Sequence, residues 1–121
     1  MMVRFKGAGG CDQRTSQGSG SLKIEFEYPV LEIYAQADGA NKFRIEFSER
    51  ELPSLFDSRL FDVSSGLIPE AWRVTREWDG SLTFGPEEWS MNSFWEAFMD
   101  REDWAVELYK IGRTKSLERS L

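Results

Sequence analysis

Apolar and charged residues alternate along three successive stretches in the first half of the chain. From Leu22 to Tyr28 every second residue is apolar, and the same spacing recurs over residues 31–37 and 42–47. A period of two is typical of strands that bury one face and expose the other to water. Turn-forming residues at 38–41 separate the last two stretches and predict an antiparallel hairpin. We therefore expect strands at 22–28, 31–37 and 42–47.

The pattern changes after residue 47. Ser48 and Glu51 have the S-x-x-E spacing of a capping box, which satisfies free backbone N–H groups at the start of a helix. A short helix is expected to begin here and to turn four apolar side chains inward, namely Leu52, Leu55, Phe56 and Leu60. Residues 62–69 contain a Ser-Ser-Gly run, which indicates a loop.

A second hairpin is predicted around Asp79 and Gly80. This pair separates two runs of strand-forming residues, 72–78 and 81–84. Asp-Gly between such runs is among the strongest short-range hairpin signals. Alternation within the runs indicates that four side chains face the core: Trp72, Val74, Leu82 and Phe84.

The last third of the chain offers two starting points for a helix. Pro86 is followed by two acidic residues, and this combination favours the first turn of a helix. Ser93 and Glu96 form a second capping box, so the helix either runs on from Pro86 or restarts at Ser93. Residues 104–111 fit a strand or a helix. We favour a strand, because Trp, Val, Tyr and Ile prefer pleated surfaces.

These elements predict a single α+β domain over residues 22–111. Short connections favour an antiparallel sheet of about five to six strands with two helices packed on one face. Residues 1–21 are rich in Gly, Ser and Gln and show no apolar period, so we expect a flexible N-terminal tail there. Residues 112–121 are expected to form a C-terminal tail.

The net charge of −6 is unevenly distributed. Residues 24–110 hold 19 of the 21 acidic residues but 8 of the 15 basic ones. This acidic segment repels phosphate backbones and attracts basic proteins, so we expect no nucleic-acid partner through the folded body. Solubility is the ordinary alternative reason for the charge. The chain has no apolar run near the ~20 residues that span a bilayer, no secretory signal and one cysteine, which favours the cytoplasm and no membrane partner.

The sequence lacks the residues most used in catalysis. It has no histidine, and its single cysteine, Cys11, lies in the Gly-rich N-terminal stretch, which excludes Ser-His-Asp and Cys-His triads. Carboxylates alone would need to face each other across a cleft. We therefore expect neither an enzyme nor a cofactor. Four carboxylates of the predicted strands are expected to lie in solvent: Glu25, Glu27, Glu32 and Glu46.

No metal site is expected either. Zinc sites use Cys and His ligands at defined spacings, which this chain lacks. Asp100, Glu102 and Asp103 form a compact acidic cluster, but they lack the D-x-D-x-D-G register and distal Glu of a calcium loop.

The tryptophans are the remaining signal. All five lie between residues 72 and 104. Most should be buried, but a small domain has a limited interior, so we expect some rings at the surface. Trp78 and Trp89 are the candidate anchors of a partner site with a carboxylate rim. The predicted partner-binding residues are Trp78, Asp79, Glu87, Glu88, Trp89, Asp100, Glu102 and Asp103.

The segment from Trp72 to Trp104 combines a Trp-led hairpin with the runs Gly-Pro-Glu-Glu-Trp and Ser-Phe-Trp-Glu-Ala-Phe-Met-Asp. In this it resembles small uncharacterised bacterial proteins carried on mobile elements, including integron gene cassettes and toxin-immunity loci. The resemblance implies a cytoplasmic, non-enzymatic binding protein and carries over no catalytic residue.

Two functions follow from the sequence. The first is an acidic protein-binding module that docks a basic protein partner through exposed Trp and carboxylates. An immunity-like protein would fill such a role. The alternative is a small-ligand-binding protein with an aromatic cavity between sheet and helix. Surplus aromatic surface also fits a homodimer, in which the partner is a second copy of the chain.

Overall fold

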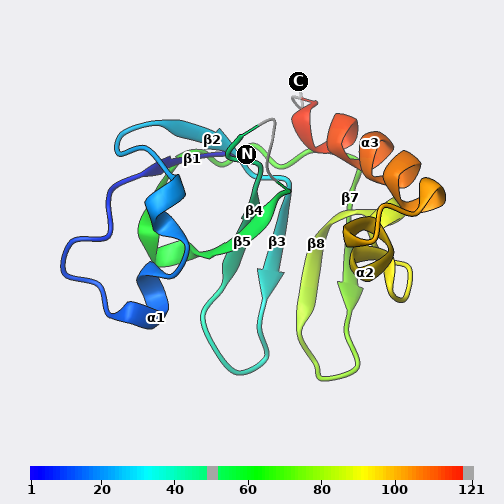
Figure 1. Cartoon of the computed structure of the whole chain (residues 1–121), viewed down its shortest axis with the longest axis horizontal. Helices are drawn as coiled ribbons and strands as arrows, with labels where there is room; N and C mark the ends of the chain where they lie inside the picture. Colours follow the sequence, from blue (N-terminus) through cyan, green and yellow to red (C-terminus); the bar gives the residue numbers. More distant parts are fainter. Residues whose placement is uncertain (49–51, 119–121) are drawn as a thin grey trace.

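A computed structural model describes residues 1–48 and 52–118 of the chain (Figure 1). Within these residues, eight strands form two antiparallel sheets. The three-stranded sheet has the order β2 (Glu27–Pro29), β1 (Met2–Phe5) and β6 (Phe61–Ser65). The five-stranded sheet has the order β5 (Ser54–Asp57), β4 (Lys42–Ile45), β3 (Glu32–Ala35), β8 (Leu82–Pro86) and β7 (Trp72–Arg76).

The helices lie at two sides of the strands. The short α1 (Gln13–Ser16) lies near β5, whereas α2 (Phe94–Met99) and α3 (Asp103–Leu117) lie beside β7 and β8 (Figure 1). Single 3₁₀ turns occur at Ser19–Ser21, Ser58–Leu60 and Glu87–Trp89, the last labelled η3 here. The predicted α+β class is confirmed, although the strands form two sheets where the sequence indicated one. No helix in the described part of the chain is both long and apolar enough to cross a membrane.

The main core lies between the two sheets. Val3 and Phe5 of β1 meet Phe43 and Ile45 of β4 there, and all four are at most 7% exposed. Phe61 packs its ring against three other phenylalanines, with centroid distances of 5.9 Å to Phe5, 5.8 Å to Phe43 and 6.5 Å to Phe56. This core joins both sheets.

A second core joins η3, α2 and α3. The ring of Trp89 stacks on that of Tyr109 at a centroid distance of 5.4 Å and an interplanar angle of 8°. Phe94, Phe98 and Ala105 complete its buried centre. A Cβ on Gly112 would collide with the indole of Trp89, so α3 needs glycine at this point.

Glu46, which directly follows β4, connects the five-stranded sheet to α3 through hydrogen bonds. Its carboxylate accepts a 2.6 Å hydrogen bond from the Tyr109 hydroxyl and a 3.0 Å bond from Arg113 Nε. Burial, together with the hydrogen bond to Glu46, raises the pKa of the Tyr109 hydroxyl. Glu46 therefore holds the helix in place and is not the solvated charge that the alternation predicted.

Both predicted hairpins are confirmed. β3 and β4 pair antiparallel with Ile33 opposite Phe43, within the strands expected at 31–37 and 42–47. β7 and β8 pair around the Asp79-Gly80 turn, with Gly80 at φ = 89°. In both cases the signal is local, because the turn and the alternation lie next to each other in the chain.

The prediction that residues 1–21 form a flexible tail is wrong where this segment forms β1, α1 and the 3₁₀ turn at Ser19–Ser21. β1 is the central strand of the three-stranded sheet, and Val3 and Phe5 are almost fully buried. The expected strand at 22–28 is also mostly wrong, because the chain turns at Glu25 (φ = 70°) and pairs only from Glu27.

Three further elements differ from the sequence expectations. The capping box falls partly on residues 49–51, outside the described residues, and the expected helix is replaced by β5, whose Leu55 pairs with Arg44. The expected loop at 62–69 begins as β6 because β1 offers it a partner. The segments 104–111 and 112–117, expected as a strand and a tail, form α3.

Candidate functional site

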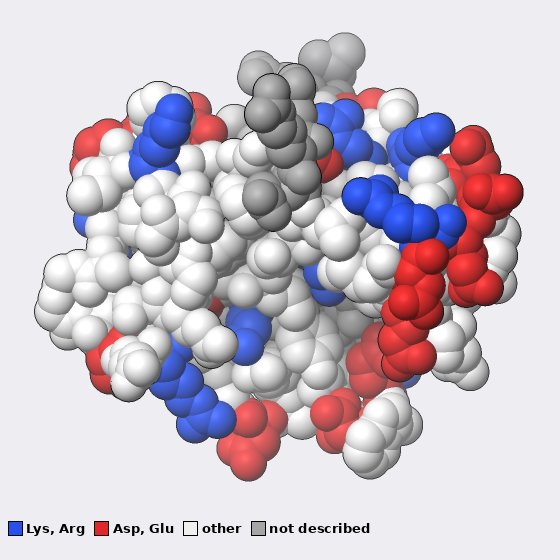
Figure 2. Space-filling model, viewed as in Figure 1, with Lys and Arg blue, Asp and Glu red and all other residues white. Residues whose placement is uncertain are grey.

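A groove of about 450 Å³ lies on the outer face of the five-stranded sheet, opposite the main core. Its floor comes from the strands, and one wall comes from the segment between η3 and α2. Figure 2 shows this face, with a hollow near its middle and acidic side chains along its lower and right-hand edges. The residues that carry its chemistry are Glu32, Arg44, Glu77, Thr83, Gly85 and Trp95.

Strand alternation places the floor residues. Phe43 and Ile45 of β4 point into the main core, so Arg44 between them points to the outer face. Glu32 of β3 lies directly opposite Arg44 in the β3–β4 register. The hairpin therefore brings an acid and a base together as a cross-strand pair on the groove side.

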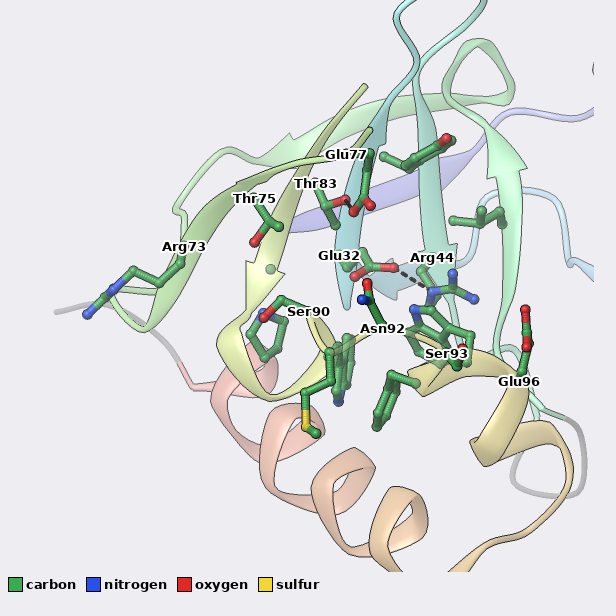
Figure 3. Close-up of a pocket in the computed structure, with 18 of the residues that line it drawn as sticks. Glu32, Arg44, Arg73, Thr75, Glu77, Thr83, Ser90, Asn92, Ser93 and Glu96 are labelled. Atoms are coloured by element: carbon green, nitrogen blue, oxygen red, sulfur yellow. Dashed lines mark hydrogen bonds and ion pairs between the residues drawn. The ribbon is translucent and has the colours of Figure 1, made fainter. Parts of the chain in front are cut away.

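Glu32 and Arg44 form a buried ion pair. Arg44 Nε donates to Glu32 Oε1 at 2.8 Å, and the two residues are 8% and 3% exposed, respectively (Figure 3). The guanidinium of Arg44 also stacks on the Trp95 ring, with its Cζ 3.6 Å from the ring centroid. Glu32 and Trp95 thus fix Arg44 from two directions, and a cation on an aromatic face adds electrostatic attraction.

Burial raises the pKa of Glu32 above its ordinary value, because a carboxylate loses its hydration on this floor. The attraction of Arg44 opposes that shift, and the negative charge of Glu77 adds to it. Glu77 is therefore close enough to Glu32 for the two charges to interact. In Figure 3 both carboxylates point into the same part of the groove.

Glu77 is held by β8. Its Oε1 accepts a 3.0 Å hydrogen bond from the Thr83 hydroxyl. Neither the Oε2 atom of Glu77 nor that of Glu32 accepts a hydrogen bond from residues 1–48 or 52–118. These two oxygens are the open acceptors of the groove.

Gly85 leaves the floor open beside Glu32. A Cβ at this position would lie 3.0 Å from the Glu32 Cβ and 3.4 Å from its Oε2. Any side chain at residue 85 would therefore crowd Glu32. The glycine is needed for space, since its φ lies outside the left-handed range.

Two of the predicted partner-binding residues lie on the rim. Trp78 is 97% exposed at the β7–β8 turn, and Asp79 follows it there. The Ser81 backbone N–H donates to the Asp79 carboxylate at 2.9 Å and lowers the pKa of that group. The turn is thus a fixed structure that presents an indole ring to solvent.

The other predicted residues are dispersed. Trp89 reaches the groove wall but is 4% exposed and belongs to the second core, so it is not an exposed anchor. Glu88 is paired with Lys115; burial opposes ionisation, but the hydrogen bond from Lys115 leaves the pKa of Glu88 lowered. Four carboxylates lie exposed outside the groove: Glu87, Asp100, Glu102 and Asp103.

The acidic cluster around residues 100–103 shows no metal-binding arrangement. In the described parts of the chain, no group of three or more His, Cys, Asp or Glu side chains could hold a metal ion. Glu102 precedes α3 as its N-cap residue, and Asp103 lies in the first turn of that helix. Acidic residues are favourable there because they face the positive end of the helix dipole.

Sequence reasoning missed the residues at the centre of the groove. Glu32 was assigned to solvent, and Arg44, Glu77 and Trp95 were not singled out. One signal was available: a hairpin with equal alternation on both strands places Glu32 opposite Arg44, and opposite charges in a cross-strand pair are stabilising. The sequence does not indicate that Glu32 and Arg44 are buried, because their burial depends on residues 90–96.

Comparison with protein-family models, with curated proteins and with solved structures finds no match to this chain.

Proposed function

We propose that this protein is a non-catalytic binding module that docks a basic protein partner on the groove face of the five-stranded sheet. The supporting observation is the exposed indole of Trp78 beside a groove lined by carboxylates. A fully wet tryptophan has much surface to bury, and aromatic anchors with a polar rim are typical of protein interfaces.

The charges on this face favour a cationic partner. Four carboxylates line the groove, Glu32, Glu77, Asp79 and Glu96, against the two guanidinium groups of Arg44 and Arg73. Arg44 is already paired with Glu32. In Figure 3 Arg73 points away from the central group of side chains. A surface of this kind attracts a basic protein and accelerates the encounter.

The absence of histidine from the sequence supports a binding role over catalysis, since histidine is the usual general base. Both carboxylates that converge in the groove already have a polar partner in the protein. Glu32 is neutralised by Arg44 and Glu77 is held by Thr83, so both are fixed by polar partners.

Affinity capture tests the proposal. The tagged protein is used to capture partners from a lysate of the source cells at low and high salt. Two variants are tested in parallel. The groove variant combines Trp78→Ala with Glu77→Gln, and the control variant, Asp100→Asn, lies outside the groove. We expect a basic protein that is retained at low salt, released at high salt, lost with the groove variant and kept with the control.

Capture that is indifferent to salt and to the groove variant would remove the proposal. A small molecule is the second candidate, since a groove of about 450 Å³ is within the usual size of ligand sites. Native mass spectrometry of the purified protein distinguishes the two, because a tightly held small ligand adds its mass in the absence of any partner. Light scattering reports whether the partner is a second copy of the chain.

A further inference from the structure

We propose that the floor of the groove is a guanidinium site, which takes the end of an arginine side chain between Glu32 and Glu77. The inference rests on the proposed function, because it assigns that arginine to the basic partner. It names the chemical group that the groove recognises and the atoms that recognise it.

The open acceptors determine the class of ligand. Glu32 Oε2 and Glu77 Oε2 have no donor in the described part of the chain, and both carboxylates point into the same space (Figure 3). Two carboxylates around one space can share a cation whose N–H donors are spread over several atoms. A guanidinium has five N–H donors in a planar fork, whereas an ammonium is a compact point charge.

The groove also has room for a planar group. The groove has a volume of about 450 Å³, and Gly85 adds no side chain beside Glu32. Tyr34 lies on the same face of β3 as Glu32 and lines the groove with a partly exposed ring. A planar cation that enters beside Gly85 can therefore meet the carboxylates at its edge and an aromatic ring at its face.

Arg44 acts as a positioning residue in this arrangement. Its Nε holds Glu32 Oε1 at 2.8 Å, which directs the other oxygen toward the groove. Its own guanidinium lies against Trp95. The floor thus already stabilises one guanidinium with a carboxylate and an indole, and the chemistry proposed for the ligand is the same.

An anionic ligand fits this floor less well. A phosphate or carboxylate would meet the negative charge of Glu77 in the groove. The Arg44 charge is offset by Glu32, and Thr83 donates its hydroxyl to Glu77. Like charges repel each other more strongly in a partly buried site than in bulk water.

Three small probes test the site on the whole protein. They are the Nα-acetyl methylamides of arginine, of citrulline and of lysine, which share a backbone and differ in the terminal group. Binding is followed by NMR through the Gly85 amide and the Trp95 indole N–H. We expect the arginine probe to shift both signals in a saturable way and the neutral citrulline probe to bind at least about tenfold more weakly. The lysine probe is expected to fall between them.

Variants locate the site. Glu77→Gln removes one charged acceptor without altering the buried ion pair, and we expect about tenfold weaker binding of the arginine probe. Glu87→Gln is the matched control, because Glu87 is exposed and lies outside the groove; its affinity should equal that of the unmodified protein. Gly85→Ala keeps every charge but crowds Glu32, and it should also weaken binding.

The outcomes separate this inference from the proposed function. Equal binding of the arginine and citrulline probes, or equal loss in Glu77→Gln and Glu87→Gln, overturns the guanidinium site. If a basic partner is still captured in a manner that depends on Trp78, the docking face stands and only the assignment of its ligand group fails. Saturable, Glu77-dependent binding of the arginine probe supports the site, whether or not a protein partner is captured.

Discussion

The two faces of the five-stranded sheet are built from alternate residues of the same strands, yet they have opposite characters. On β4, Phe43 and Ile45 are sealed under the three-stranded sheet, whereas Arg44 between them faces the groove. The inner face packs on the three-stranded sheet through the main core, although Val74 on the edge strand β7 is 61% exposed. The outer face meets the six-residue helix α2 and its preceding loop, which leave a groove of about 450 Å³.

The comparison shows that strand alternation selects the face of each residue, but the covering element decides its environment. Where the three-stranded sheet covers the inner face, that face presents apolar side chains such as Phe43, Ile45 and Phe56. The short helix leaves part of the outer face accessible and part of it buried. Charged residues persist there, but they need partners, and this is why Glu32 and Arg44 occur as a pair.

The inner face should give the largest response to mutation. Phe61→Ala removes a ring that contacts Phe5, Phe43 and Phe56, and should lower the free energy of unfolding by about 3–5 kcal/mol in a urea titration. Val74→Ala is the control, because Val74 is 61% exposed and should change stability by less than about 0.5 kcal/mol. Equal effects of the two substitutions would contradict the described core.

The buried pair on the outer face should give the next effect. Arg44→Met leaves the carboxylate of Glu32 buried without its cation, and should cost about 3 kcal/mol of unfolding free energy. The double variant Glu32→Leu, Arg44→Met removes both charges and should recover most of that loss, because a well-packed apolar pair is close to neutral. A double variant as unstable as the single one would show that the cost comes from lost packing.

The hairpins could be predicted because their information is local. Asp79 and Gly80 specify a turn. The flanking alternation placed Trp72 in the core correctly, but Val74, which it also assigned to the core, is 61% exposed. α3 carried its own signal as well, since its buried residues Ala105, Tyr109 and Gly112 have helical spacing. The strand propensity of Trp, Val, Tyr and Ile favours a strand here, but packing of α3 against η3 stabilises the helix.

The groove and β1 could not be predicted because they depend on distant parts of the chain. Met2–Phe5 is a short strand followed by a Gly-rich segment, and its partners begin at Glu27 and Phe61. Glu32 is buried beside residues 90–96, some sixty positions away. The exposure of Trp78 could be predicted, because a hairpin tip has few neighbours. The burial of Trp89 could not, because it depends on packing against α3.

Glu32 and Glu88 should titrate on opposite sides of the ordinary glutamate value of 4.5. Burial raises the pKa of Glu32, so the native state keeps this carboxyl protonated up to a higher pH than the unfolded state does. The stability that Glu32 contributes is therefore present below pH 4.5 and is lost as the pH rises through the raised pKa. The pKa of Glu88 is lowered, because the bond from Lys115 outweighs burial, so its stability is present above 4.5 and is lost as the pH falls.

The carboxyl carbon shifts of the two residues, followed by NMR against pH, measure both values. Lys115→Met should raise the titration midpoint of Glu88 and leave that of Glu32 unchanged, since Lys115 does not act on the groove. Coincident midpoints in the unmodified protein would contradict the difference in environment.

The smallest effect on stability is expected at the rim. Trp78 is 97% exposed, so Trp78→Ala should change the free energy of unfolding by less than about 0.5 kcal/mol. Trp89→Ala is the matched comparison, because the same ring is removed from a site 4% exposed, and it should cost about 3–5 kcal/mol. If Trp78→Ala leaves the fold intact but abolishes capture of a partner, the Trp78 ring serves recognition. Stabilities that fall together would instead place Trp78 among the residues that hold the hairpin.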